Sequence, residues 1–158
     1  MTFLYSTISG PENVRAQSAA ELLAIARGLP AWDALIVVAE NQDYPRLHLS
    51  WHDGHGFVVH CFENDASWGF FLTDALPFSS PEVEIEMGGQ ALEKWPRQLF
   101  VGSKRALEAL DFFLKTGKQN ETPHWVRADA FPREIVWEGR EGREAWEKSR
   151  EKKDRESN

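Results

Sequence analysis

Short runs that alternate apolar and polar residues, or that consist of β-branched and aromatic residues, dominate the middle of the chain. Both patterns are typical of β-strands rather than helices. The clearest run is 82–87, where Val83, Ile85 and Met87 are expected to face a core while the intervening glutamates face solvent. The predicted strands are 34–39, 46–51, 57–62, 68–72 and 82–87, with shorter ones at 98–101, 125–126 and 135–137 and a strand or irregular arm within 1–10.

Two segments carry helix signals at both ends. Ser18 and Glu21 have the spacing of a capping box, in which each side chain satisfies a free backbone N–H, and Gly28 ends the apolar pattern that follows. Ser103 is expected to cap a second helix over 104–116, which Gly117 ends. The sequence therefore predicts one helix before the strands and one after most of them.

Asp53-Gly54 is the strongest local turn signal, because this pair favours a two-residue type I′ hairpin. That turn predicts pairing of His52 with His55 and of Leu47 with His60. The other predicted pairs are Ser50 with Phe57 and Leu49 with Val58. In this register His48, His52 and His55 share one face of the sheet and His60 lies on the other.

These elements predict an α+β fold: an antiparallel meander sheet flanked by an N-terminal and a C-terminal helix. A single domain is expected over residues 1–137. Residues 138–158 are charged and almost free of apolar groups, and they are expected to form a helical or disordered tail.

Composition narrows the class of protein. The 158 residues are 42% hydrophobic, enough for a buried core, and no apolar run approaches the roughly 18–20 residues of a membrane span. A single cysteine, Cys61, excludes an intrachain disulfide and, with no apparent secretory signal, favours the cytoplasm. The net charge of −7 argues against direct binding of nucleic acid.

The negative charge is concentrated in the middle of the chain. The tail after residue 132 is neutral, and no Lys or Arg occurs between Arg46 and Lys94. Acidic residues in this interval are interleaved with aromatics, a composition that suits an interface with a basic partner, although a solvated acidic face is the alternative. The candidate partner-binding residues are Glu63, Asp65, Trp68, Asp74, Glu82, Glu84 and Glu86.

No motif of a known catalytic site is present, so an enzyme is not expected. Four histidines within 48–60 are the best candidates for a metal or small-ligand site, with His52 and His55 as neighbours and Asp53 as a third ligand. Hairpin histidines are more often ordinary surface residues, so no metal or cofactor is expected. Cys61 is expected to be a small buried residue.

The second half of the chain resembles the immunity protein 1 family, small α+β proteins encoded beside bacterial polymorphic toxins. The resemblance covers roughly residues 33–126 and is carried by the order of a few residues. They are Gly88-Gly89, Val101-x-Ser103, Ala106-x-x-Ala109-x-x-Phe112-Phe113-x-x-Thr116-Gly117, Pro123 and Trp125.

The resemblance implies a cytoplasmic protein that binds and neutralises a cognate toxin, often one of the nucleic-acid deaminase fold. It implies no catalytic residue, and Gly88, Gly89, Phe113, Gly117 and Trp125 match as scaffold positions. A toxin that acts on nucleic acid has a basic groove, which an acidic surface would block. The alternative is a small ligand- or metal-binding domain that uses the His48–His60 hairpin.

Overall fold

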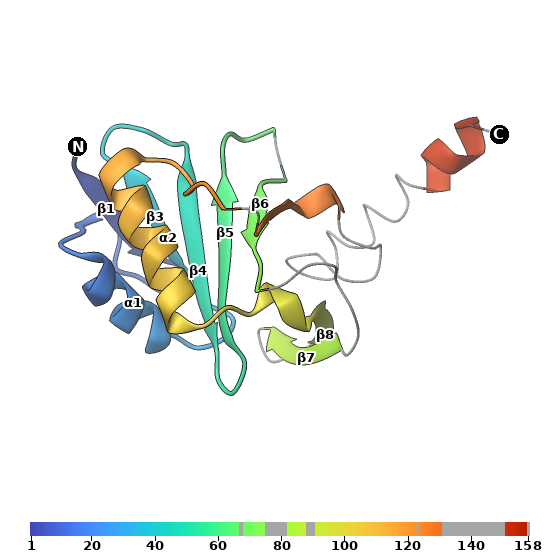
Figure 1. The fold of residues 1–158 in the computed structure, drawn as a ribbon, viewed down its shortest axis with the longest axis horizontal. Helices are drawn as coiled ribbons and strands as arrows, with labels where there is room; N and C mark the ends of the chain where they lie inside the picture. Colours follow the sequence, from blue (N-terminus) through green and yellow to red (C-terminus); the bar gives the residue numbers. More distant parts are fainter. Residues whose placement is uncertain (67, 75–81, 88–90, 123, 131–150, 158) are drawn as a thin grey trace.

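The computed structural model describes residues 1–66, 68–74, 82–87, 91–122, 124–130 and 151–157. It confirms the predicted α+β class: seven antiparallel strands form one sheet in the order β2-β1-β3-β4-β5-β6-β9 (Figure 1). The strands of this sheet are β1 (Phe3–Thr7), β2 (Val14–Arg15), β3 (Leu35–Ala39), β4 (Arg46–His52), β5 (Gly56–Phe62), β6 (Phe70–Leu72) and β9 (Trp125–Arg127). A separate hairpin consists of β7 (Glu82–Met87) and β8 (Ala91–Pro96).

Both predicted helices are present. Helix α1 (Ala19–Arg27) begins as expected, with the Ser18 hydroxyl accepting a hydrogen bond from the Glu21 N–H at 3.2 Å. Helix α2 (Ser103–Thr116) ends at Gly117, whose φ of +70° is the left-handed conformation that glycine adopts at helix ends. The predicted Ser103 cap is wrong: Gly102 occupies that position. The Ser103 hydroxyl instead accepts a hydrogen bond from Arg27 of α1, so it links the two helices.

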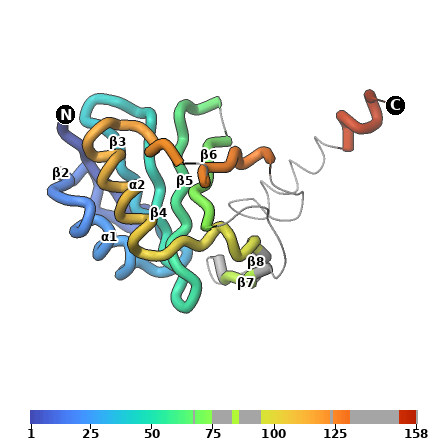
Figure 2. The backbone as a smooth tube through the Cα atoms, in the orientation of Figure 1, coloured from blue at the N-terminus to red at the C-terminus, as the bar shows by residue number. Residues whose placement is uncertain are grey.

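The main core lies between the two helices and one face of the sheet. Odd-numbered residues of β3, β4 and β5 point toward the helices, because side chains alternate along a strand. Leu35, Leu47 and Val59 are fully buried there, and so is Phe113 of α2. Figures 1 and 2 show α1 and α2 side by side on this face, and no α-helix of the described residues packs on the opposite face.

The pairing of β4 with β5 differs by one residue from the predicted register. His48 pairs with His60, Leu47 with Cys61 and His52 with Gly56, so three residues, 53–55, connect the strands instead of two. Gly56 has a φ of +132°. There is no space for a side chain at this position, since a Cβ there would lie 2.7 Å from the Val101 carbonyl oxygen. The extra loop residue places His48 and His60 on the same face, opposite to the helices.

The β7–β8 hairpin packs against the second face of the sheet. Val83 and Ile85 are buried together with Trp95 of β8 against Val58 and Phe71, as predicted for the apolar side of 82–87. Strand β8 was not predicted. The strand expected at 98–101 is a short 3-10 helix, η1 (Arg97–Leu99), followed by a single bridge between Val101 and Phe57.

The C-terminal part of the chain is described only in sections. Strand β9 confirms the one predicted at 125–126 and is followed by the 3-10 helix η2 (Ala128–Ala130). Residues 151–157 form an exposed helical segment. The strand predicted at 135–137, the domain boundary after residue 137, and Gly88, Gly89 and Pro123 lie outside the described residues.

The tight contact between Gly56 and Val101 predicts that Gly56→Ala will destabilise the protein more than the matched change Gly54→Ala. Both positions have positive φ, which costs an alanine about 1–2 kcal/mol, but nothing lies within 4 Å of a Cβ at Gly54. We expect Gly56→Ala to lower the free energy of unfolding by about 2 kcal/mol more than Gly54→Ala, measured by urea denaturation. Equal losses in the two variants would contradict the close approach.

Candidate functional site

The predicted partner-binding residues divide into two groups at opposite ends of β5. Glu63, Asp65 and Trp68 lie in or directly beside the connection from β5 to β6, at the end of β5 marked by Phe62 (Figure 1). Asp74 lies at the other end, where it lines a hollow together with His55 of the β4–β5 loop and Val83 of β7. The structure therefore separates the acidic residues into two surfaces.

In the second group the Asp74 charge is compensated. The Arg105 guanidinium lies 3.7 Å from the Asp74 carboxylate and donates hydrogen bonds to the carbonyl oxygens of Thr73 and Asp74 at 2.6 and 2.7 Å. Glu84 of β7 is exposed, as predicted, and its backbone pairs with that of Lys94 in β8. Glu82 and Glu86 belong to the same strand, and their side chains lie outside the described part of the structure.

The first group forms a surface that we call the Trp68 corner, a hollow of about 480 Å³. Its lining residues are Glu63, Ala66, Trp68, Gly69, Phe70, Arg127 and Asp129. The Trp68 side chain is 51% exposed, which is unusual for so large an apolar group. An exposed aromatic beside carboxylates is the combination that was predicted for an interface.

Backbone geometry at Gly69 determines where Trp68 lies. Gly69 has a φ of +76°, and a Cβ there would lie 2.5 Å from the Cys61 carbonyl oxygen. This close approach brings the Trp68 carbonyl oxygen within 2.7 Å of His60 Nε2, which donates the hydrogen bond because a carbonyl oxygen accepts only. The corner is thus held against the end of β5 by the His60 hydrogen bond and by the close approach of Gly69 to Cys61.

The Trp68 corner retains a negative charge. Arg127 and Asp129 form an ion pair at 2.8 Å, which leaves the exposed Glu63 as the further carboxylate that lines the corner. Asp65 is exposed in the same connection.

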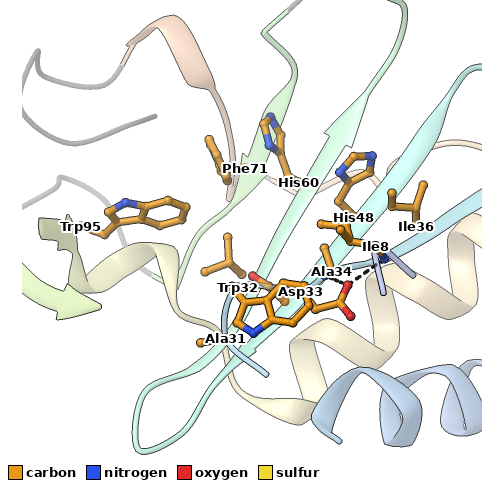
Figure 3. Close-up of a pocket in the computed structure, with 12 residues that line it drawn as sticks. Ile8, Ala31, Trp32, Asp33, Ala34, Ile36, His48, His60, Phe71 and Trp95 are labelled. Atoms are coloured by element: carbon orange, nitrogen blue, oxygen red, sulfur yellow. Dashed lines mark hydrogen bonds between the residues drawn. The ribbon is translucent and has the colours of Figure 1, made fainter. Parts of the chain in front are cut away.

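A third hollow, of about 200 Å³, lies on the sheet face opposite α1 and α2 (Figure 3). We call it the histidine hollow. Its lining residues are Ile8, Ala31, Trp32, Asp33, Ala34, Ile36, His48, Ser50, Val58, His60, Phe71 and Trp95. Figure 3 shows His48 and His60 projecting from neighbouring strands, with Trp95 to their left and Trp32 below them.

The histidines are grouped differently from the prediction. His48 and His60, expected on opposite faces, share the hollow, while His52 is buried and packs against Trp95 and Phe100. The His60 ring stacks on Phe71 with centroids 3.9 Å apart. Among the residues that the structure describes, no three His, Cys, Asp or Glu side chains are grouped so that they could hold a metal ion.

Burial keeps the His52 ring and the Cys61 thiol neutral. Burial, together with the neighbouring His55, lowers the pKa of His52 to about 4, and its Nε2 lies 3.0 Å from the Ser50 hydroxyl. Burial and the Glu63 charge raise the pKa of the Cys61 thiol to about 12. Cys61 is 2% exposed, so its prediction as a buried residue is confirmed. A thiol in this state is unreactive.

Asp33 shapes the wall of the histidine hollow, and sequence reasoning missed it. Its carboxylate is 1% exposed and accepts hydrogen bonds from the backbone N–H groups of Ile8 at 2.8 Å, Ala34 at 2.7 Å and Ser9 at 3.3 Å, and from the Ser9 hydroxyl. Burial acts to raise the pKa of Asp33, but these donors outweigh it, so the pKa lies below its ordinary value. The carboxylate joins the end of β1 to the start of β3.

Trp32 and Trp95 were also missed as parts of a site. Trp32 is adjacent to Asp33 in a polar connection, and Trp95 lies in a strand that was not predicted. The Trp-Asp pair directly before a β-branched strand is the signal that could have drawn attention to the first of them.

Comparisons of the chain with protein-family models and with curated proteins found no match. In the described part of the chain, no helix is both long enough and apolar enough to cross a membrane.

Asp33→Asn is expected to lower the free energy of unfolding by about 2–3 kcal/mol at pH 7, because the amide NH₂ would face backbone donors. The pKa of Asp33 is lowered by folding, so its contribution is complete above about pH 4 and is lost as the pH falls through the folded value. Urea denaturation of both proteins at pH 7, 5 and 3 measures this. A difference in stability that is unchanged at pH 3 would contradict the role of the charged carboxylate.

Proposed function

We propose that this chain is an immunity protein that binds a toxin domain acting on nucleic acid and blocks its basic groove, with no reaction of its own. The Trp68 corner is the observation that carries the proposal. It joins an exposed aromatic side chain to the exposed carboxylate of Glu63, and this is the combination that a protein needs to dock on a basic surface.

The charges of the corner favour attraction of a basic partner. Glu63 and Asp65 are exposed, and they lie within the long interval from Arg46 to Lys94 in which the sequence has no other Lys or Arg. A surface of one sign speeds the encounter with a surface of the opposite sign. In the other acidic surface, the Arg105 guanidinium lies 3.7 Å from the Asp74 carboxylate, which weakens the attraction of Asp74 for a basic partner.

The exposed Trp68 supplies the anchor. Charged side chains at the rim of an interface mainly affect the rate of association, whereas a buried aromatic residue slows dissociation. Because Gly69 and the His60 hydrogen bond hold the backbone of the corner, Trp68 is presented without a large loss of chain entropy on binding.

The alternative is a small ligand- or metal-binding domain on the β4–β5 hairpin. The observation that favours it is the placement of His48 and His60 in one hollow. Zinc that remains with the purified protein, and is lost from His60→Ala, would support this alternative over the immunity function.

The protein encoded immediately upstream of this chain's gene is the partner to test. We expect its C-terminal domain to be toxic in cells, to be neutralised by co-expression of this chain, and to co-purify with it in a 1:1 complex by size-exclusion chromatography. An upstream protein with no toxic domain, or a toxic domain that does not bind this chain, would contradict the proposal.

Reversal of charge at the Trp68 corner, Glu63→Lys with Asp65→Lys, is expected to slow association with that toxin domain about tenfold at low ionic strength. The difference is expected to shrink as salt is added, since salt screens exposed charges. Stopped-flow or surface plasmon resonance measurements at two salt concentrations give the rates.

The matched control for this change is Glu12→Lys with Glu108→Lys, which reverses two exposed carboxylates outside both acidic surfaces. The association rate of this control is expected to stay close to that of the unchanged protein, and an equal effect in the control would contradict the role of the Trp68 corner. Trp68→Ala is expected to increase the dissociation rate instead, and Leu107→Ala, an exposed apolar residue on α2, is its control.

A further inference from the structure

We propose that the histidine hollow is an anchor pocket that receives one large uncharged apolar side chain, aromatic or leucine-like, from the toxin. This inference rests on the proposed function and adds a second point of attachment to it. The Trp68 corner attracts the partner by charge, and the hollow excludes water around a single apolar group.

The placement of exposed apolar side chains supports this inference. Helices α1 and α2 cover one face of the sheet, and the hollow lies on the other face, between residues 31–34 and Trp95 of the β7–β8 hairpin (Figures 1 and 3). At its rim, Ile8 is 63% exposed and Trp32 is 45% exposed. Apolar groups around a hollow mark an interaction site far more often than isolated exposed residues do.

The charge of the hollow disfavours a cationic occupant. Asp33 is the one carboxylate among the described residues that line it, and that carboxylate already accepts hydrogen bonds from Ile8, Ser9 and Ala34. A cationic side chain would lose its hydration without gaining a free carboxylate as partner. The remaining walls are mainly apolar and include Ile36, Val58 and Phe71.

The size of the hollow favours a side chain over a free small molecule. Sites for small molecules usually enclose about 300–1,000 Å³. The histidine hollow, at about 200 Å³, is smaller and has exposed residues at its mouth, so a free ligand would be incompletely buried. A side chain that belongs to a docked protein needs only its own volume, because the protein around it covers the mouth.

The walls are held in place before binding. The Asp33 hydrogen bonds join the Ile8 end of β1 to the strand that begins at Leu35, and His60 lies against both Phe62 and Phe71 with centroids 3.9 Å apart in each case. A preformed pocket loses little conformational entropy when it is filled, which increases affinity.

The first experiment uses indole as a probe and the isotope-labelled full-length protein. Millimolar indole is expected to shift the NMR signals of the Trp32 and Trp95 side-chain N–H groups. Ala31→Trp, which adds a large side chain at the hollow, is expected to abolish these shifts, and Ala20→Trp on the exposed side of α1 is the matched control. Absence of shifts in the unchanged protein would overturn the inference.

The second experiment measures the affinity of the toxin domain for the same proteins. Trp32→Ala and Ala31→Trp are each expected to raise Kd at least about 30-fold, the effect of losing a central apolar anchor, while Ala20→Trp leaves Kd unchanged. Thermal unfolding of each variant verifies that it is folded. If Ala31→Trp does not fold, the Kd of Trp32→Ala is the result that tests the inference. A tight complex with unchanged Kd in the hollow variants overturns this inference alone. Failure of the unchanged protein to bind overturns the proposed function as well.

Discussion

Pairing of β4 with β5 determines which side chains face the helices and which face the opposite side of the sheet. Leu47, Leu49 and Val59 belong to the main core because the register places them on the same side. A slip of one residue would turn one of these strands over and bring histidines into the core. The three-residue loop and the conformation of Gly56 therefore specify both the core and the histidine hollow.

Main-chain hydrogen bonding to side chains positions the two candidate surfaces. The Asp33 carboxylate ties the end of β1 to the start of β3, and His60 Nε2 donates to the Trp68 carbonyl. His60 takes part in both surfaces, since its ring lines the hollow while its hydrogen bond holds the corner. The two proposed points of attachment are thus linked through one side chain.

Negative charge is distributed less simply than the sequence indicates. The interval from 47 to 93, which has no Lys or Arg, places Glu63 and Asp65 at one end of β5 and Asp74 at the other, and Arg105, from far along the chain, pairs with Asp74. Compensation by a distant residue depends on how α2 packs against the sheet. Glu63 and Asp65, which lie close to Trp68 in the sequence, are exposed.

Local patterns were enough to predict the α+β class, both helices and the main strands. The signals were the Ser18 cap, the glycine after α2 and the alternation over 82–87, which depend on neighbours in the chain. The exposure of Glu84 also followed from this alternation, and the polar turn beside Trp68 indicated the exposure of Trp68. Other features depend on contacts between distant segments: the β4–β5 register, the Asp33 hydrogen bonds and the Arg105–Asp74 pair. Strand β8, which was missed, pairs with its neighbour β7. Gly56 illustrates the reason. The Val101 backbone leaves no space for a side chain at Gly56, but Val101 lies 45 residues later in the chain, and no local pattern could place it there.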